Sequence, residues 1–168
     1  DTDLNSLIEL PSGNIAAVGT CLNCAPGDLS QKALILQTDA NGTLLRDTTL
    51  GRNGLHAQGK DLVLANNSKI AVTGQVVTAG GFAPSNAFLT VLDEQLQLEF
   101  WTEHHALFYD IGNALVRTGD GGYAIAGWSL ANLTASRQAL VFRLDASGNL
   151  LWKYNSPLLS SEFNDIEQ

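Results

Sequence analysis

Only a few side chains in this sequence have types and spacings that could carry out chemistry. Cys21 and Cys24 form a C-x-x-C pair within a long polar stretch. A zinc site needs four ligands and usually a second such pair, and a thioredoxin-like pair lies at the start of a helix; the sequence offers neither. In an exported protein, a pair with this spacing typically forms a local disulfide. We therefore expect these two cysteines to staple their loop.

A second group of candidates combines imidazole, carboxylate and aromatic side chains. Such groups, gathered on one surface, can bind a metal ion or transfer protons. His104 and His105 are adjacent, so in an extended segment they point to opposite sides and at most one of them faces a given ligand. No metal-ligand spacing is present, and we expect the histidines to be solvated loop residues. The candidate ligand-binding residues are His56, Glu103, His104, His105, Tyr109, Asp110 and Trp128.

Two further motifs are superficially similar to calcium-binding loops, Asp39-x-Asn41-Gly42 and Asp145-x-Ser147-Gly148. Both lack the additional oxygen ligands and the Glu at the twelfth position of an EF-hand, so we expect turns closed by the Asp side chain. The sequence contains no nucleophile elbow, phosphate-binding loop or His-Glu-x-x-His motif. We therefore expect no catalytic residue, no metal site and no cofactor.

The elements that position these residues repeat along the chain. Gly19, Gly74 and Gly127 are 55 and 53 residues apart, and each closes the second apolar segment of its repeat. Asp39, Asp93 and Asp145 close the third segment with spacings of 54 and 52 residues. Because these two sets of landmarks shift together, the chain consists of three similar units rather than one irregular domain.

Each unit contains four short segments rich in Val, Ile, Leu and aromatic residues and bounded by Gly, Asn, Asp and Ser, which is typical of strands. Four antiparallel strands repeated at this interval predict an all-β fold, a β-propeller of about three four-stranded blades in one domain. The blades are expected at about 3–55, 56–109 and 110–163, and 164–168 begins a further repeat. The strands expected in the third blade are Ala114–Thr118, Tyr123–Trp128, Gln138–Leu144 and Leu150–Tyr154.

The connections divide this expected scaffold into two ends. Tight turns join the first strand to the second and the third to the fourth, so they share one end. The other end collects the long loops 20–31, 77–85 and 129–136 and the links 51–60 and 103–112. We place the candidate ligand face at this loop end, where Trp128 could stack on a sugar. Trp101 and Trp152 are expected on outer strands, packed between blades.

Composition limits the partners. The chain has 17 acidic and 9 basic residues, and its net charge of −8 disfavours nucleic acid and anionic membrane surfaces. No apolar run approaches the roughly 20 residues of a membrane-spanning helix. There is no Met and no signal peptide in the sequence, which suggests a processed chain or a piece of a longer one.

The third unit carries a resemblance that can be named. Asp120-Gly-Gly-Tyr123, Ala126-Gly127, the segment 144–152 and the later Asn164-Asp165 resemble the propeller repeats of secreted and surface-attached bacterial proteins. Unit one is similar, with Arg46 where Trp152 aligns, and unit two keeps Leu92-Asp93 and Trp101. The segment 144–152 is also similar to repeats of pyrroloquinoline quinone dehydrogenases, in which an Asp, a Gly and a Trp lock neighbouring blades. The resemblance implies a propeller and export.

These observations favour a non-catalytic, exported propeller that acts as an interaction or adhesion scaffold at the cell surface or in an extracellular assembly. Three blades do not close a ring, so the partner is expected to be a protein or a second copy bound through blade edges. The alternative is a carbohydrate-binding or quinoprotein-like enzyme propeller whose site requires further blades. A third possibility is a purely structural assembly of stacked or paired blades.

Overall fold

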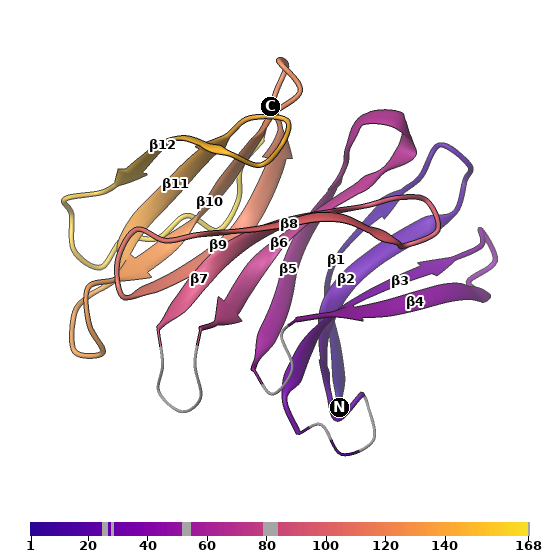
Figure 1. Cartoon of the computed structure of the whole chain (residues 1–168), viewed down its shortest axis with the longest axis horizontal. Helices are drawn as coiled ribbons and strands as arrows, with labels where there is room; N and C mark the ends of the chain where they lie inside the picture. Colours follow the sequence, from indigo (N-terminus) through magenta and orange to yellow (C-terminus); the bar gives the residue numbers. More distant parts are fainter. Residues whose placement is uncertain (25–26, 28, 52–54, 79–83, 168) are drawn as a thin grey trace.

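The structure of the chain is a computed structural model, which describes residues 1–24, 27, 29–51, 55–78 and 84–167. The all-β prediction is confirmed, because these residues form twelve strands and one short 3-10 turn, η1 (Asn66–Ser68) (Figure 1). The strands are β1 (Thr2–Glu9), β2 (Ile15–Leu22), β3 (Gln31–Thr38), β4 (Leu44–Leu50), β5 (Ala57–Leu64), β6 (Ile70–Val77), β7 (Ser85–Leu92), β8 (Leu98–His104), β9 (Tyr109–Arg117), β10 (Tyr123–Leu130), β11 (Gln138–Leu144) and β12 (Leu150–Asn155).

Consecutive strands pair in antiparallel order in three groups of four. We call these groups unit 1 (β1–β4), unit 2 (β5–β8) and unit 3 (β9–β12). Unit 1 is a separate sheet, whereas units 2 and 3 are joined by one parallel pair, Ser85 with Tyr109. The third strand of unit 2 (β7) and the first strand of unit 3 (β9) therefore meet at a single residue pair, and each group keeps its own up-and-down order.

The first strand of unit 3 begins earlier than the sequence suggests. It starts at Tyr109 rather than Ala114, because residues 109–112 pair with the end of β10 across a bulge. Glu103 and His104 likewise belong to β8. The expected link 103–112 is therefore wrong at both ends, and only residues 105–108 connect the two units. The link expected at 51–60 is also shorter, because β5 begins at Ala57.

A bulge explains the glycine that recurs in every unit. The innermost strand of each unit shifts register against its neighbour opposite Gly19, Gly74 and Gly127. A Cβ atom at these positions would lie 1.8, 1.9 and 1.9 Å from the carbonyl oxygens of Asp3, Gln58 and Ile111, respectively. No side chain fits in that space, so the period seen in the sequence marks a backbone contact.

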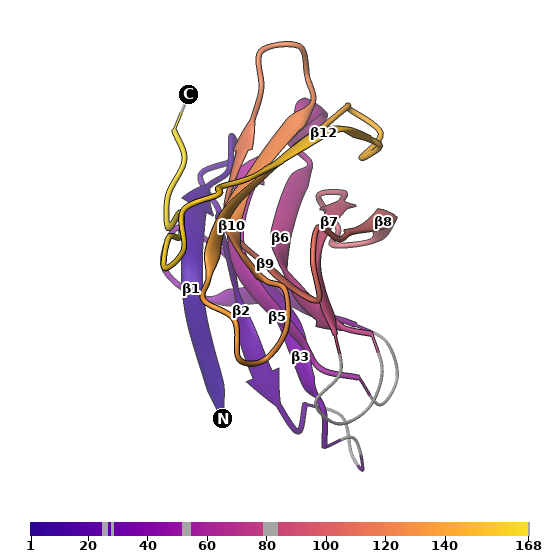
Figure 2. The ribbon, with the colours of Figure 1, turned by 90° about the vertical axis from the view of Figure 1, so that its left-hand side faces the viewer.

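The units pack side by side through their first strands (Figures 1 and 2). Strand β5 packs against β1, β2 and β3 of unit 1, and β9 packs against β5, β6 and β7 of unit 2. Strand β6 is buried along its whole length because it has a neighbouring unit on each side. The first strands thus form the centre of the arrangement and the fourth strands its outer edge.

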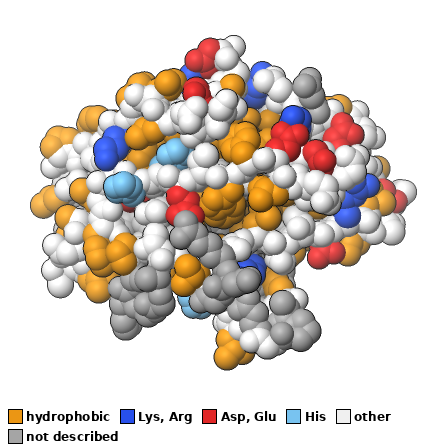
Figure 3. All heavy atoms as spheres, viewed as in Figure 1, with side chains coloured by type: hydrophobic (Ala, Val, Ile, Leu, Met, Phe, Trp, Pro, Cys, Tyr) orange, Lys and Arg blue, Asp and Glu red, His pale blue; other side chains and the backbone are white. Residues whose placement is uncertain are grey.

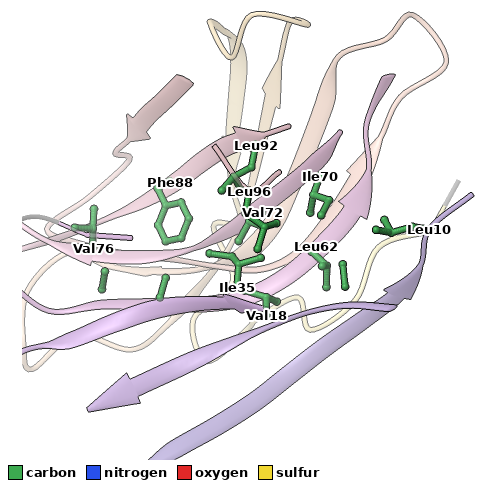
Figure 4. Packing of buried hydrophobic residues seen from close by; sticks show 13 residues of the cluster. Leu10, Val18, Ile35, Leu62, Ile70, Val72, Val76, Phe88, Leu92 and Leu96 are labelled. Atoms are coloured by element: carbon green, nitrogen blue, oxygen red, sulfur yellow. The ribbon is translucent and has the colours of Figure 1, made fainter. Parts of the chain in front are cut away.

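The hydrophobic core consists of two clusters, one at each junction. At the junction of units 1 and 2, Val18 and Ile35 face Leu62, Val72 and Phe88 (Figure 4). At the junction of units 2 and 3, the opposite sides of β6 and β7 contribute, and the cluster there includes Ala71, Leu89, Leu115, Ile125 and Phe142. Alternate residues of β6 and β7 therefore enter different clusters, as the period of two in a strand requires.

The turns between third and fourth strands have one construction. Asp39 Oδ1 accepts hydrogen bonds from the N–H groups of Asn41 (2.9 Å) and Thr43 (2.8 Å). Asp93 and Asp145 accept the equivalent pairs from the second and fourth residues that follow them. The backbone hydrogen bond from Thr43 is the main reason that the pKa of Asp39 is below its ordinary value. The expectation of Asp-closed turns is confirmed.

Candidate functional site

Five of the seven candidate ligand-binding residues fall at the end of β8, in the link to β9, or at the start of β9. Glu103 and His104 end β8, His105 lies in the link, and Tyr109 and Asp110 begin β9. Trp128 lies on β10, where it pairs with Ile111 next to the Ser129–Asp110 pair. His56 lies apart, at the junction of units 1 and 2, where its Nδ1 accepts a hydrogen bond from Gln31 N (3.1 Å). The seven residues do not form one site.

Asp110 is fully buried, and its carboxylate holds the link between the units. Oδ2 accepts hydrogen bonds from Ala106 N (2.8 Å) and Leu107 N (3.3 Å), and Oδ1 accepts one from Leu107 N (3.2 Å). The Ser85 hydroxyl donates to the Asp110 carbonyl oxygen (3.2 Å). Burial raises the pKa of Asp110 to about 6, and the two backbone donors oppose that shift. Through these hydrogen bonds, the Asp110 carboxylate holds residues 106 and 107 of the link in place.

His104 is buried, which corrects the expectation that the histidines are solvated loop residues. Its Nε2 lies 3.0 Å from the Thr102 hydroxyl, and its ring centroid lies 5.7 Å from that of Phe142 in unit 3. Burial lowers the pKa of His104 from its ordinary value of 6.5, and the nearby Glu103 opposes that shift. Its neighbour His105 is exposed, so the adjacent imidazoles do point to different environments.

The aromatic face of Trp128 is occupied by other side chains of the chain. The Tyr109 ring stacks on it with centroids 6.1 Å apart and planes 12° apart. The Arg137 guanidinium carbon lies 4.2 Å from the Trp128 ring centroid, and Arg137 also forms an ion pair with Glu162. This cation–π arrangement ties the β10–β11 loop to the segment after β12. A sugar would have to compete with these contacts to stack on Trp128.

Glu103 faces the junction of units 1 and 2, opposite to His104. Its Oε1 accepts a hydrogen bond from Trp101 Nε1 and its Oε2 accepts one from Asn86 Nδ2, both at 3.1 Å. Trp101 stacks on the buried Phe88 ring, with centroids 4.2 Å apart. Trp101 and Glu103 line a surface hollow of about 260 Å³ together with Leu98 and with residues 49–51 of unit 1. This hollow places an aromatic side chain next to a carboxylate.

The remaining sequence candidates are placed as follows. Cys21 and Cys24 are joined by a disulfide at the start of the β2–β3 loop, with Cα atoms 6.0 Å apart. Among the described residues, no group of three or more His, Cys, Asp or Glu side chains is arranged to hold a metal ion. That part of the chain also lacks a helix long and apolar enough to cross a membrane.

Sequence reasoning missed a set of residues that lock neighbouring units together. Asn5 Nδ2 donates to Gly59 O (2.7 Å), and Asn113 Nδ2 donates to Phe163 O (3.0 Å). Asp61 Oδ1 accepts from Leu62 N (2.9 Å), and its Oδ2 accepts from Leu115 N in unit 3 (2.8 Å). These polar residues fall at or next to the bulge in each first strand. The sequence signal was an Asn or Asp just before the recurring Leu of each unit.

The comparison with known proteins adds no assignment. A scan against protein-family models finds no match to this chain, and a search of curated proteins finds none that is similar.

Proposed function

We propose that this chain forms three blades of a β-propeller and acts as a non-catalytic interaction or adhesion scaffold of an exported protein, at the cell surface or in an extracellular assembly. The loop end of the blades is the proposed partner-binding face, because long loops held by a rigid frame are where such scaffolds bind.

The main support is that both junctions are built from the same parts at the same repeat positions. Leu62 and Leu115 are each 2% exposed and occupy equivalent places in their clusters. Gly59 and Gly112 are also equivalent, and a Cβ at either would approach Gly19 O (2.9 Å) or Gly74 O (3.5 Å) of the preceding unit. Units that bury one face on each side are expected to extend into a ring.

The ionisable groups at the loop end support a non-catalytic role. Asp110 accepts hydrogen bonds from two backbone groups, His104 contacts Thr102 and Phe142, and Glu103 accepts from Trp101 and Asn86. Each of these side chains is engaged by other residues of the chain. A general acid or base must instead reach a substrate.

The test is a screen of the purified chain against a glycan array and in a titration with a quinone cofactor. We expect no binding in either assay. If glycan or quinone binding is found and is lost in Glu103→Gln while the thermal unfolding curve is unchanged, the non-catalytic scaffold is the wrong function.

The hollow beside Trp101 favours carbohydrate binding as a second candidate function. An indole next to a carboxylate can offer apolar contact and hydrogen bonding to one sugar ring. In this case Trp101→Ala would abolish signals on the glycan array. Leu44→Ala, which changes an exposed residue of unit 1 outside the hollow, would leave them unchanged.

A further inference from the structure

At the two junctions within the chain, the same parts of each unit contact the neighbouring unit. At both, the Leu that follows the bulge enters the core of the junction. At both, the turn between third and fourth strands covers the preceding unit. Leu96 of the 93–97 turn is buried in the cluster shared with unit 1, and a Cβ on Gly148 of the equivalent turn would lie 2.9 Å from Phe100 Cε2 of unit 2.

In unit 1, the same parts are exposed. Leu7, the equivalent of Leu62 and Leu115, is 66% exposed. A shallow hollow of about 320 Å³ lies beside it, lined by residues 4–7 and Ala17. Gly42 of the 39–43 turn is the equivalent of Leu96 in unit 2 and Gly148 in unit 3. A Cβ atom on Gly42 would have no atom within 4 Å. The face of unit 1 that should cover another unit is therefore open.

Unit 3 presents the complementary face. Strand pairing aligns Trp152, opposite Arg143, with Phe100, opposite Val91. Trp101, which the sequence suggested as the counterpart of Trp152, instead aligns with Lys153. Trp152 is 52% exposed, unlike the expectation that it packs between blades, and Tyr154 two residues later is half-exposed. In unit 2, the turn of the following unit covers Phe100. In unit 3, the equivalent Trp152 is uncovered.

Charge distinguishes head-to-tail docking from pairing of like faces. Residues 1–55 carry six acidic and three basic side chains, and residues 110–163 carry four of each. On the face drawn in Figure 3, acidic side chains lie mainly on the right, over unit 1 and the adjoining part of unit 2, interspersed with Lys and Arg side chains. Two copies of unit 1 would repel each other, whereas unit 1 against the neutral unit 3 would not.

We propose that the open face of unit 1 docks on the open face of unit 3 in a second copy of this chain, with the 39–43 turn over Trp152 and Leu7 at the inner strand. This inference rests on the proposed blade architecture. Head-to-tail contacts close into a ring when the rotation allows it, and two chains supply six units, within the range of four to eight that propellers use.

The segment after β12 shares the docking face. Phe163 N donates to Gly127 O (3.0 Å), and Asn113 binds Phe163 O, as Asn5 binds Gly59 O at the first junction. Phe163 therefore stands at the place of an incoming first strand, the position that Leu4 holds in β1. The docking includes displacement of residues 163–167 by β1 of the second copy. A chain ending at Glu162 should associate more tightly.

The experiment measures mass by sedimentation equilibrium of the 168-residue chain. We expect a species of twice 17.9 kDa. Leu7→Glu and Trp152→Glu should each weaken association by about 30-fold or more, as for central interface residues. Leu44→Glu is the matched control, because Leu44 and its equivalents Leu98 and Leu150 are all exposed, even Leu98 in unit 2, which has a junction on each side.

Mixing identifies the direction of docking. Leu7→Glu and Trp152→Glu each leave one face intact, so their mixture should regain a dimer that neither forms alone. A chain that stays monomeric at millimolar concentration, no recovery on mixing, or weaker association of the chain ending at Glu162 would overturn the proposal. Unchanged circular dichroism and thermal unfolding in the variants would then show that the docking failed while the proposed blades remained.

Discussion

Gly59 packs closely against unit 1, so an alanine there should be costly. A Cβ at this position would lie 2.4 Å from Val18 Cγ2 and 2.9 Å from Gly19 O, and the second atom belongs to the backbone of a buried strand. Overpacking of this kind costs about 1–3 kcal/mol. The reduced freedom of the unfolded chain returns about 0.4–1 kcal/mol. We therefore expect Gly59→Ala to lower the free energy of unfolding by about 1–2 kcal/mol.

The assay is urea and thermal unfolding followed by far-ultraviolet circular dichroism. For a chain of this length, the expected loss lowers the midpoint of thermal unfolding by roughly 3–8 °C. Leu4→Ala is the matched control, because Leu4 holds the equivalent position in unit 1 and is exposed; its effect should stay within about 0.5 kcal/mol. A midpoint for Gly59→Ala equal to or above that of the unaltered chain would refute the close approach of units 1 and 2.

Three further predictions concern single side chains. Burial raises the pKa of Asp110 from the ordinary 3.8 to about 6, so ionisation of this carboxyl destabilises the fold as the pH rises from about 4 to 6. Relative to Asp110→Asn, the free energy of unfolding of the unaltered chain should fall by about 3 kcal/mol across that range, measured by urea unfolding. A difference between the two chains that does not change with pH would contradict the burial of the carboxyl. Leu96 has a φ of +59° and is buried. Leu96→Gly should relieve about 1 kcal/mol of backbone strain but lose about 2–5 kcal/mol of packing energy, so the variant should be less stable. A stabilised variant in calorimetry would contradict the place of Leu96 in the core. Reduction of the Cys21–Cys24 disulfide should lower stability by about 2 kcal/mol at most, because the closed loop is short, and a much larger loss in urea unfolding would show that it supports more than its loop.

The repeat in the sequence predicted the strands well because its landmarks have local causes. Gly74 recurs because the bulge leaves no space for a side chain, and Asp93 recurs because its carboxylate closes a turn. Both requirements are met within a few residues or by one neighbouring strand. The turn and strand positions were therefore accessible from the sequence.

The candidate site was less predictable because burial depends on neighbouring units. His104 was expected in solvent, yet Phe142, 38 residues later, covers it from unit 3. Trp128 was expected to be available, yet Arg137 packs on its ring. The role of Asp61 between units could not be predicted from its local sequence, because its partner Leu115 lies 54 residues away, one repeat later. The repeat period itself is the signal that could have linked such a pair.

One kind of interface is used twice in this chain, between units 1 and 2 and between units 2 and 3. Ile35 and Val72 lie together at the first junction (Figure 4), and their repeat equivalents, Leu89 and Ile125, belong to the cluster at the second. Methyl–methyl nuclear Overhauser effects in the selectively labelled chain test this directly. We predict cross-peaks for Ile35–Val72 and for Leu89–Ile125. Strong cross-peaks within each unit, with neither of these two between units, would contradict the account.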